Sequence, residues 1–376
     1  MERILQVGMD WKLGGIEIFI MSLYRNIDRN KYQFDFICDA RKKVCFEEEI
    51  KELGGRIFYI TPRSTNFLKH IKETKKIIME NNYKVVHWHA NTLNNNIPVM
   101  LALKNKDTKV IIHSHSCWKG KNFKILFLHY FHSFLLPKKR IIKVACSNEA
   151  GKWMFNNAEF KLIRNGVNIS KFTFSDENRK NIRNYLNIQD DTVVCGNVGG
   201  FNEAKNHGFL IEIFNQYLKI NPNCILILIG SGRLEEGIKK KVKSLNLQEK
   251  VLFLGECKNV NVYYSAFDAF IFPSLYEGLG IALIEAQISG VKCFVSDAIP
   301  EDAIITDKVE RISLSSDTKI WAKKIYEGLS EENKRIIENK NRIDLYDEKK
   351  LALEVQKLYD DLTKEKGERW RKLVKA

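Results

Sequence analysis

The sequence has few prolines, no closely spaced cysteines and no long apolar run, and each absence excludes a class of protein. Six prolines among 376 residues are too few for a collagen-like or proline-rich disordered chain. The eight cysteines stand singly, so we expect reduced, mostly buried thiols in a cytoplasmic protein rather than disulfides. No run reaches the roughly 18 apolar residues that a membrane-spanning helix needs. A globular chain of two domains is expected.

Acidic residues are scarce in the first part of the chain. Residues 1–150 hold 26 Lys and Arg against 14 Asp and Glu, whereas residues 151–376 hold 35 against 32, so the first part carries most of the net charge of +15. A basic face attracts nucleic acid, an anionic membrane or a phosphorylated substrate. Nucleic acid fits least, because no recognisable nucleic-acid-binding module accompanies the charge.

One apolar segment, residues 119–143, has basic groups at both ends. Such a segment is typical of a helix that lies on a membrane surface, but a buried helix with basic ends has the same pattern. The basic tail, residues 364–375, is either a second membrane contact or a solvated chain end. The candidate membrane-contacting residues are Lys119, Lys121, Lys124, Phe127, Phe131, Lys138, Lys139 and Arg140.

Strand-like apolar runs alternate with helix-length amphipathic segments, which is the pattern of parallel α/β sheets. Turn residues around Asn165-Gly166 separate two such series. We therefore expect an α/β fold of two doubly wound, Rossmann-like domains facing a central cleft, with substrate at the carboxyl ends of the strands. Helices are expected at about Gly15–Ile27, Phe46–Leu53, Phe67–Asn81, Thr92–Leu103, Lys205–Ile220, Leu234–Leu245, Leu279–Ser289 and Asp317–Leu329.

Two glycine loops at strand ends have features of phosphate sites. Gly14-Gly15 precedes a helix whose free N–H groups can bind an anion, although a plain tight turn has the same sequence. Gly199-Gly200 opens the corresponding turn of the second series, where Lys205 adds positive charge at the helix start. This spacing is neither a dinucleotide fingerprint nor a P-loop.

The loop from Pro273 to Ala286 is the most specific. Glu277 lies on the loop and could hold sugar hydroxyls, while Glu285 lies within the following helix and could bind a ribose diol. A helix cap and a solvated glutamate are the alternative interpretation.

Histidines follow two strands of the first series, in His87-Trp88-His89 and His113-Ser114-His115. Alternation places His113 and His115 on one face, as in some metal sites. No acidic or cysteine partner is spaced to complete such a site, so no metal is expected. At least one of these histidines is expected to line the cleft.

Together these residues resemble the E-x7-E signature and glycine loops of retaining glycosyltransferases of family four, which have the GT-B fold. The resemblance covers nearly the whole chain and is closest to bacterial enzymes of capsular and exopolysaccharide synthesis. It implies an acceptor-side domain at 1–166 and a nucleotide-sugar domain at 167–346. Residues 347–376 would be a helix returning to the first domain plus the basic tail. The motifs are the Gly14-Gly15 loop, Asn165-Gly166-Val167, Gly199…Lys205, Gly230-Ser231-Gly232 and Glu277…Glu285.

The resemblance also implies residue roles. Glu277 would bind a hydroxyl of the donor sugar, Glu285 the ribose, and Lys205 the departing diphosphate. His115 would lie near the reacting carbon and the acceptor, which Glu17 would also face. Glu277, His115 and Lys205 are thus the catalytic candidates. The donor-binding candidates are Gly15, Gly199, Gly200, Lys205, Arg233, Glu277, Gly278, Leu279, Gly280 and Glu285.

The implied reaction moves a hexose or N-acetylhexosamine from a nucleotide diphosphate sugar to a lipid-linked saccharide, with retention and without metal or other cofactor. A UDP-sugar is the expected donor. The expected partners are this donor, the lipid-linked acceptor and the anionic surface of the inner face of the cell membrane. Retention would come from attack on the same face as the leaving group, with catalysis by positioning and charge stabilisation.

One position departs from the family pattern. The arginine expected directly after Gly199 is Gly200, which removes a bidentate partner of the diphosphate, and Arg233 is the residue that could compensate. Two other functions remain open: a non-catalytic nucleotide-sugar- or membrane-binding subunit, which Gly200 favours, and a nucleotide-sugar epimerase of the same shape.

Overall fold

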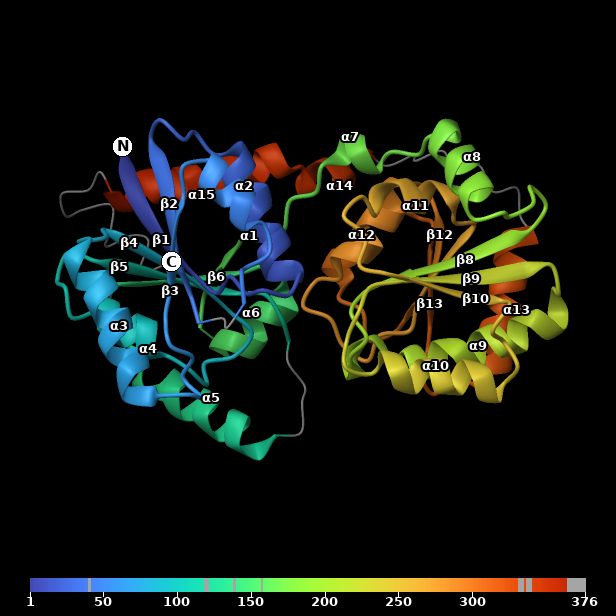
Figure 1. The fold of residues 1–376 in the computed structure, drawn as a ribbon, viewed down its shortest axis with the longest axis horizontal. Helices are drawn as coiled ribbons and strands as arrows, with labels where there is room; N and C mark the ends of the chain where they lie inside the picture. The colour runs from blue at the N-terminus through green and yellow to red at the C-terminus, as the bar shows by residue number, and fades with distance from the viewer. Residues whose placement is uncertain are drawn as a thin grey trace. The chain divides into compact units, whose positions relative to one another are not determined.

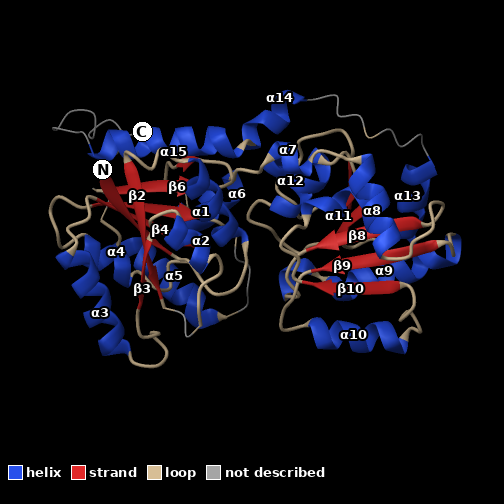
Figure 2. Ribbon diagram, turned by 45° about the horizontal axis from the view of Figure 1, so that its top comes forward, coloured by secondary structure: helices blue, strands red, loops and turns tan. Residues whose placement is uncertain are grey.

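The computed structural model describes residues 1–39, 42–117, 122–137, 140–156, 158–330, 335 and 340–363. The chain divides into two compact units, one of residues 1–166 together with the chain from Tyr346 onward, the other of residues 167–345. Each unit is a parallel sheet covered by helices (Figures 1 and 2). The predicted α/β class with two doubly wound domains is therefore confirmed.

The sheet of the first unit has the strand order β3-β2-β1-β4-β5-β6-β7 within the described residues. The order reverses between β1 and β4, so the loops after these two strands meet at a topological switch point. The strands are β1 (Glu2–Val7), β2 (Tyr32–Cys38), β3 (Arg56–Tyr59), β4 (Val85–Ala90), β5 (Lys109–Ser114), β6 (Ile141–Ala145) and β7 (Lys161–Leu162).

Helices cover both faces of this sheet. Alternate strand residues point to opposite faces, so Ile4 packs in the core beneath α1 and α15, while Leu5 packs in the core beneath α3 and α4. Helix α15, red in Figure 1, buries Leu351, Val355 and Tyr359 and contacts α1. The helices are α1 (Gly15–Asn26), α2 (Glu47–Glu52), α3 (Phe67–Glu80), α4 (Ile97–Ala102), α5 (Phe123–Leu135), α6 (Asn148–Phe155) and α15 (Glu348–Thr363).

The sheet of the second unit has the order β10-β9-β8-β11-β12-β13, again counted over the described residues, with its switch point between β8 and β11. The strands are β8 (Val193–Val198), β9 (Cys224–Ile229), β10 (Val251–Gly255), β11 (Ala269–Phe272), β12 (Lys292–Ser296) and β13 (Val309–Ile312). The helices are α7 (Ile169–Phe172), α8 (Asp176–Tyr185), α9 (His207–Ile220), α10 (Glu235–Ser244), α11 (Asn261–Ala266), α12 (Ile281–Ile288), α13 (Thr318–Ser330) and α14 (Lys340–Ile343), with short 3₁₀ turns at Glu203–Lys205, Glu301–Ala303 and Asp344–Tyr346.

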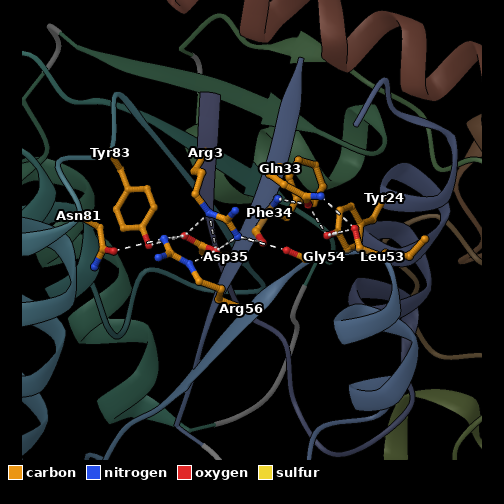
Figure 3. Close-up of polar contacts among 10 residues, drawn as sticks. All are labelled: Arg3, Tyr24, Gln33, Phe34, Asp35, Leu53, Gly54, Arg56, Asn81 and Tyr83. Carbon is orange, nitrogen blue, oxygen red and sulfur yellow. Dashed lines mark hydrogen bonds and ion pairs between the residues drawn. The ribbon is translucent and has the colours of Figure 1, made fainter. Parts of the chain in front are cut away.

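A buried carboxylate joins the first three strands of the first unit. Asp35 of β2 is fully buried and pairs with Arg3 of β1 and Arg56 of β3, while Tyr83 donates a hydrogen bond of 2.7 Å (Figure 3). Burial acts to raise the pKa of Asp35, but the hydrogen bonds from Arg56, Arg3 and Tyr83 outweigh it and leave the pKa lowered. The cluster therefore stabilises the alignment of β1, β2 and β3.

Helices α4 and α9 begin later in the chain than the sequence predicts. Helix α4 begins at Ile97 rather than near Thr92, because residues 91–96 form a polar loop that leads into a proline in the first turn of the helix. Helix α9 begins at His207 rather than at Lys205. Asn206, at φ 54°, separates it from a preceding 3₁₀ turn.

Candidate active site

Two loops meet at the switch point of the second unit. Residues 199–206 follow β8 and residues 273–280 follow β11. The Leu275 N–H donates to the Ala204 carbonyl at 2.7 Å, and Asn206 Nδ2 donates to the Pro273 carbonyl at 3.2 Å. In open α/β sheets this position is where ligands bind. The two sequence motifs of this unit therefore form one candidate site.

Lys205 and Glu277 are in direct contact at this site. Lys205 Nζ donates to Glu277 Oε1 at 2.7 Å, and the two side chains are only 17% and 11% exposed. Lys205 Nζ also lies 4.6 Å from the centroid of the Phe272 ring, a cation–π contact. A Cβ at Gly199 would lie 3.0 Å from Lys205 Cε, so glycine leaves room for the lysine. The residue predicted to bind the diphosphate, Lys205, and the residue predicted to bind the sugar, Glu277, thus lie side by side.

Glu285 of α12 is buried. Tyr264 OH donates to Glu285 Oε2 at 2.7 Å. Burial raises the pKa of Glu285 to about 7, although the Tyr264 hydrogen bond and the Lys205 charge act to lower it. This environment excludes the solvated glutamate of the alternative interpretation. A buried carboxyl with a perturbed pKa near a strand-end loop is typical of a functional site.

The other donor-binding candidates of the second unit lie on or beside the two loops that hold Lys205 and Glu277. Gly278 and Leu279 lie between Glu277 and the start of α12, and Gly280 turns the chain into that helix at φ 87°, a conformation that favours glycine. Arg233 lies after β9 and is paired with Glu203 at 2.7 Å, both side chains being exposed. A guanidinium therefore lies beside the 199–206 loop.

Gly200 has room for a side chain. A Cβ there would lie 3.4 Å from the Ser231 carbonyl oxygen, an ordinary van der Waals contact, and its φ is not in the left-handed region. The glycine is therefore not required by the backbone at this position.

The switch point of the first unit holds a pocket of about 470 Å³. Gly15 lies in its wall, and so does Glu17, a buried residue whose Oε1 accepts a 3.1 Å hydrogen bond from the Asp10 N–H. A Cβ at Gly14 would lie 2.9 Å from Glu17 Oε2, so glycine permits this approach. Burial raises the pKa of Glu17 to about 7, against the effect of backbone hydrogen bonds.

Part of the lining of this pocket is not predicted by the sequence motifs. Asp10 and the polar loop Asn91, Thr92, Asn94 and Asn95 also line it. The signal was present: this polar run follows β4, the strand paired with β1 at the switch point. The sequence pattern instead predicts a helix beginning at Thr92, so the polar loop is not recognised.

The raised pKa of Glu17 predicts a pH effect on stability. A folded state that holds a proton up to about pH 7 loses stability as the pH rises from about 4.5 to about 7, by roughly 3 kcal/mol. Glu17→Gln removes this ionisation. We expect the variant to melt at the wild-type temperature at pH 5 and several degrees higher at pH 8, measured by calorimetry. The exposed Glu52→Gln is the control, and an equal shift at both pH values would contradict the assignment.

The histidines of the first unit lie together. His115 is half-buried, its Nε2 lies 2.9 Å from His89 Nδ1, and burial lowers its pKa to about 3. Ring nitrogens of His87, His89 and His113 lie within 4.8 Å of one another, the spacing of a metal site. Both ring nitrogens of His87 and of His89, and Nδ1 of His113, instead hydrogen-bond to neighbouring side chains. The residues present fit a hydrogen-bonded network better than a metal.

Helix α5 exposes its apolar side chains. His129 is its one buried residue, stacked on Trp153 at a centroid distance of 4.3 Å. This excludes the buried-helix interpretation. Lys124 is exposed, whereas Arg140 donates to the Asn105 and Leu103 carbonyls at 2.7 Å and so has a structural role. The exposed side chains are Phe123, Phe127, Tyr130, Phe131, Phe134 and Leu135.

The other candidate membrane residues lie outside the described part of the chain. They are Lys119, Lys121, Lys138 and Lys139, together with the tail at residues 364–375. Over the part that is described, no helix is both long enough and apolar enough to span a bilayer.

Comparisons with known proteins agree with this arrangement. Residues 178–365 match the family described as "Glycosyl transferases group 1", and residues 13–171 match "Glycosyltransferase Family 4". EpsF of Bacillus subtilis, named as a glycosyltransferase, is 33% identical over 336 residues, which are 86% of this chain and 87% of EpsF.

Two further proteins are more distant. The UDP-Gal:alpha-D-GlcNAc-diphosphoundecaprenol alpha-1,3-galactosyltransferase of Escherichia coli is 20% identical over 324 residues, 82% of either chain. The structure of HepE from Anabaena with UDP and glucose has a TM-score of 0.79 at 16% identity, covering 96% of this chain and all of HepE, and it supports the fold alone. The two family matches and the likeness to EpsF show that the chain belongs to the glycosyltransferases described as group 1 and family 4, as the sequence motifs indicate.

Proposed function

We propose that the protein is a retaining, metal-independent hexosyltransferase of cell-surface polysaccharide synthesis, moving a hexose or N-acetylhexosamine from a UDP-sugar to a lipid-linked saccharide. The observation that carries the proposal is the switch-point site of the second unit, where Lys205 contacts Glu277 and Glu285 lies buried nearby on α12. These residues offer a cation for a diphosphate and two carboxylates for hydroxyl groups, which are the functional groups of a nucleotide sugar.

The names of two relatives support the donor and acceptor classes. The Escherichia coli relative is named for a UDP-sugar donor and a diphosphoundecaprenol acceptor, and the HepE structure contains UDP. By analogy, the second unit would bind the UDP-sugar and the first would bind the acceptor with His115 and Glu17.

The proposed chemistry follows from the charges. In the transition state, negative charge grows on the departing diphosphate, so a lysine fixed beside it lowers the barrier. Glu277 would orient the sugar, and an oxygen of the leaving phosphate would take the proton of the attacking hydroxyl. Positioning and charge stabilisation would thus supply the catalysis without a bound metal.

A thermal-shift panel of UDP- and GDP-sugars tests the donor site. A ligand that binds only the folded protein raises the melting temperature. We expect one UDP-sugar to stabilise the wild type, and Glu285→Ala to weaken its binding about tenfold or more, because a hydrogen bond to a charged group contributes about 1.5–3 kcal/mol. Glu310→Ala is the control, because Glu310 lies on β13, which β11 and β12 separate from β8 in the sheet. No shift with any donor at millimolar concentration would contradict the donor site and favour a non-catalytic, membrane-binding subunit.

Gly200→Arg tests the departure from the family pattern. The site has room for the Cβ, and a guanidinium there would add a bidentate contact to the diphosphate. We expect about tenfold tighter donor binding, equal to about 1.4 kcal/mol, measured by calorimetric titration with the UDP-sugar. Gly200→Gln controls for side-chain volume. Unchanged affinity in Gly200→Arg would mean that Arg233 or the loop backbone already serves the diphosphate.

A further inference from the structure

Six side chains in the core of the first unit form one continuous hydrogen-bonded chain. It links four histidines and Gln6 to Tyr359 of helix α15, and it runs in the order His115, His89, Gln6, Tyr359, His87 and His113. Gln6 lies on β1, the four histidines on or directly after β4 and β5, and Tyr359 on α15. The chain therefore connects residues from both ends of the sequence.

The contacts are short along the whole chain. His115 Nε2 lies 2.9 Å from His89 Nδ1, and His89 Nε2 lies 2.9 Å from Gln6 Oε1. Gln6 Nε2 donates to Tyr359 OH at 3.1 Å, and that hydroxyl lies 2.7 Å from His87 Nδ1. His87 Nε2 is 3.2 Å from His113 Nδ1. Both ring nitrogens of His87 and of His89 are bonded within this chain, and one ring nitrogen of His113 and of His115 is bonded at its two ends.

These histidines are neutral in the folded protein. Burial lowers the pKa of all four, and the ring of Phe19 packs against three of them, at centroid distances of 4.6–5.6 Å. A neutral imidazole has one N–H and one bare nitrogen, so it donates at one side and accepts at the other. The direction of any one bond in the chain therefore fixes the direction of all the others.

Gln6 sets that direction, because its amide has an accepting oxygen and a donating nitrogen. Gln6 Oε1 faces His89 Nε2, so His89 carries its proton on Nε2 and accepts at Nδ1 from His115 Nε2. On the other side, Gln6 Nε2 donates to Tyr359, whose hydroxyl then donates to His87. The resulting tautomer of His115 has its proton on Nε2 and a bare Nδ1.

The two end members of the hydrogen-bonded chain, His113 and His115, agree with this direction. His113 would carry its outer proton on Nε2, and the backbone of Ile163 acts to raise the pKa of His113 against the effect of burial, as an acceptor near an N–H does. His113 Nε2 itself makes no hydrogen bond to any described group. At the other end, His115 Nδ1 has no partner among the described residues. A buried acceptor without a partner in a half-buried residue is suited to a hydroxyl donor from a ligand.

We propose that Gln6 and Tyr359 are positioning residues, which hold His115 in the Nε2–H tautomer so that Nδ1 accepts a hydrogen bond from a sugar hydroxyl. The catalytic consequence rests on the proposed glycosyl transfer, whereas the tautomer does not. The C-terminal helix thus contributes a hydroxyl that orients the site as well as apolar contacts to the core.

Nitrogen NMR of the wild-type protein tests the tautomer directly. With only eight histidines in the chain, selective ¹⁵N-histidine labelling allows each ring to be assigned, and a His115→Asn variant identifies the signals of His115. Protonated and bare imidazole nitrogens have distinct chemical shifts. We expect a protonated Nε2 and a bare Nδ1 for His115. A protonated Nδ1 would mean that the chain runs in the opposite direction and would overturn the proposal.

Kinetics with variants then test the positioning role. Gln6→Met keeps the volume of the side chain but removes both amide groups, so the two tautomers of His115 should become comparably populated. The competent fraction falls to about one half, and with added ring freedom we expect kcat to fall about two- to tenfold while the donor KM stays within about twofold. Tyr359→Phe should produce a smaller change of the same kind.

Tyr32→Phe is the matched control. Tyr32 is also a buried tyrosine that donates to α15, at 2.6 Å to Asp360, but it lies outside the chain of histidines. It should lower the melting temperature about as much as Tyr359→Phe without changing the His115 signals. If Gln6→Met mixes the tautomers but leaves kcat unchanged, the positioning role is excluded while the proposed transferase function stands. If no donor or acceptor gives activity, the NMR result still decides the tautomer.

Discussion

Lys205→Met is expected to lower kcat for sugar transfer about 10²- to 10³-fold, the range seen when one group that stabilises transition-state charge is removed. Lys205 Nζ is held by Glu277 at 2.7 Å and lies over the Phe272 ring, so the charge is fixed before substrate binds. Methionine keeps most of the side-chain volume but leaves the departing diphosphate without this cation. The measurement is steady-state transfer with the UDP-sugar selected by the thermal-shift panel.

Lys324→Met is the control for this prediction. Lys324 forms a similar pair with Glu310 at 2.6 Å, between α13 and β13 of the same unit. Lys324→Met should melt within about 4 °C of the wild type, because it loses one partly exposed ion pair worth about 1 kcal/mol or less. Lys205→Met should melt lower than Lys324→Met, because it removes a cationic partner of the mostly buried Glu277, and kcat is therefore measured well below its melting temperature. An active Lys205→Met enzyme, or an equal loss of activity in Lys324→Met, would remove Lys205 from the proposed mechanism.

The triple variant Phe127→Ser, Phe131→Ser, Phe134→Ser is expected to weaken binding to anionic vesicles at least about 100-fold. These rings are 58%, 48% and 88% exposed, so they are available to a bilayer. Each ring that enters the interface contributes about 1 kcal/mol or more, and about 2.8 kcal/mol in total corresponds to 100-fold. Because the charged residues flanking α5 in the sequence are basic, we propose that the partner of this face is an anionic lipid surface.

Sedimentation with vesicles measures this binding. Wild-type protein should bind vesicles that contain phosphatidylglycerol and bind neutral vesicles much less, with the difference reduced by salt. Tyr185→Ser removes a 74% exposed aromatic residue of the second unit and should not change binding. If the wild-type protein binds neither kind of vesicle, the membrane proposal is wrong and the exposed face of α5 serves another partner.

The regular alternation of strands and helices was predictable from the sequence because hydrophobic periodicity is local. The polar helix α8 was not predicted from that pattern. Its buried side chain is Arg183, which bonds to the Gln189, Asp190 and Thr192 carbonyls. A buried arginine with backbone partners leaves no apolar stripe in the sequence, so periodicity cannot detect such a helix.

The candidate site was predictable only in part. Lys205, Glu277 and Glu285 stand out because they follow strands at a recognisable spacing, and their loops meet in the structure. Asp10 and the polar loop after β4 were not recognised, since their role depends on which strands are neighbours. Strand order is a long-range property that spacing along the chain does not encode.

The sequence by itself determined the α/β class, the family and the three residues Lys205, Glu277 and Glu285 of the candidate site, because these follow from local periodicity and from a signature of fixed spacing. The tertiary structure decided what the environment does to those residues. Burial raises the pKa of Glu17 and of Glu285 to about 7, and α5 turns its apolar residues outward. It also brings Tyr359 next to Gln6, 353 residues away in the chain. Burial and long-range hydrogen bonds arise only when distant segments pack together, so only the folded chain determines them.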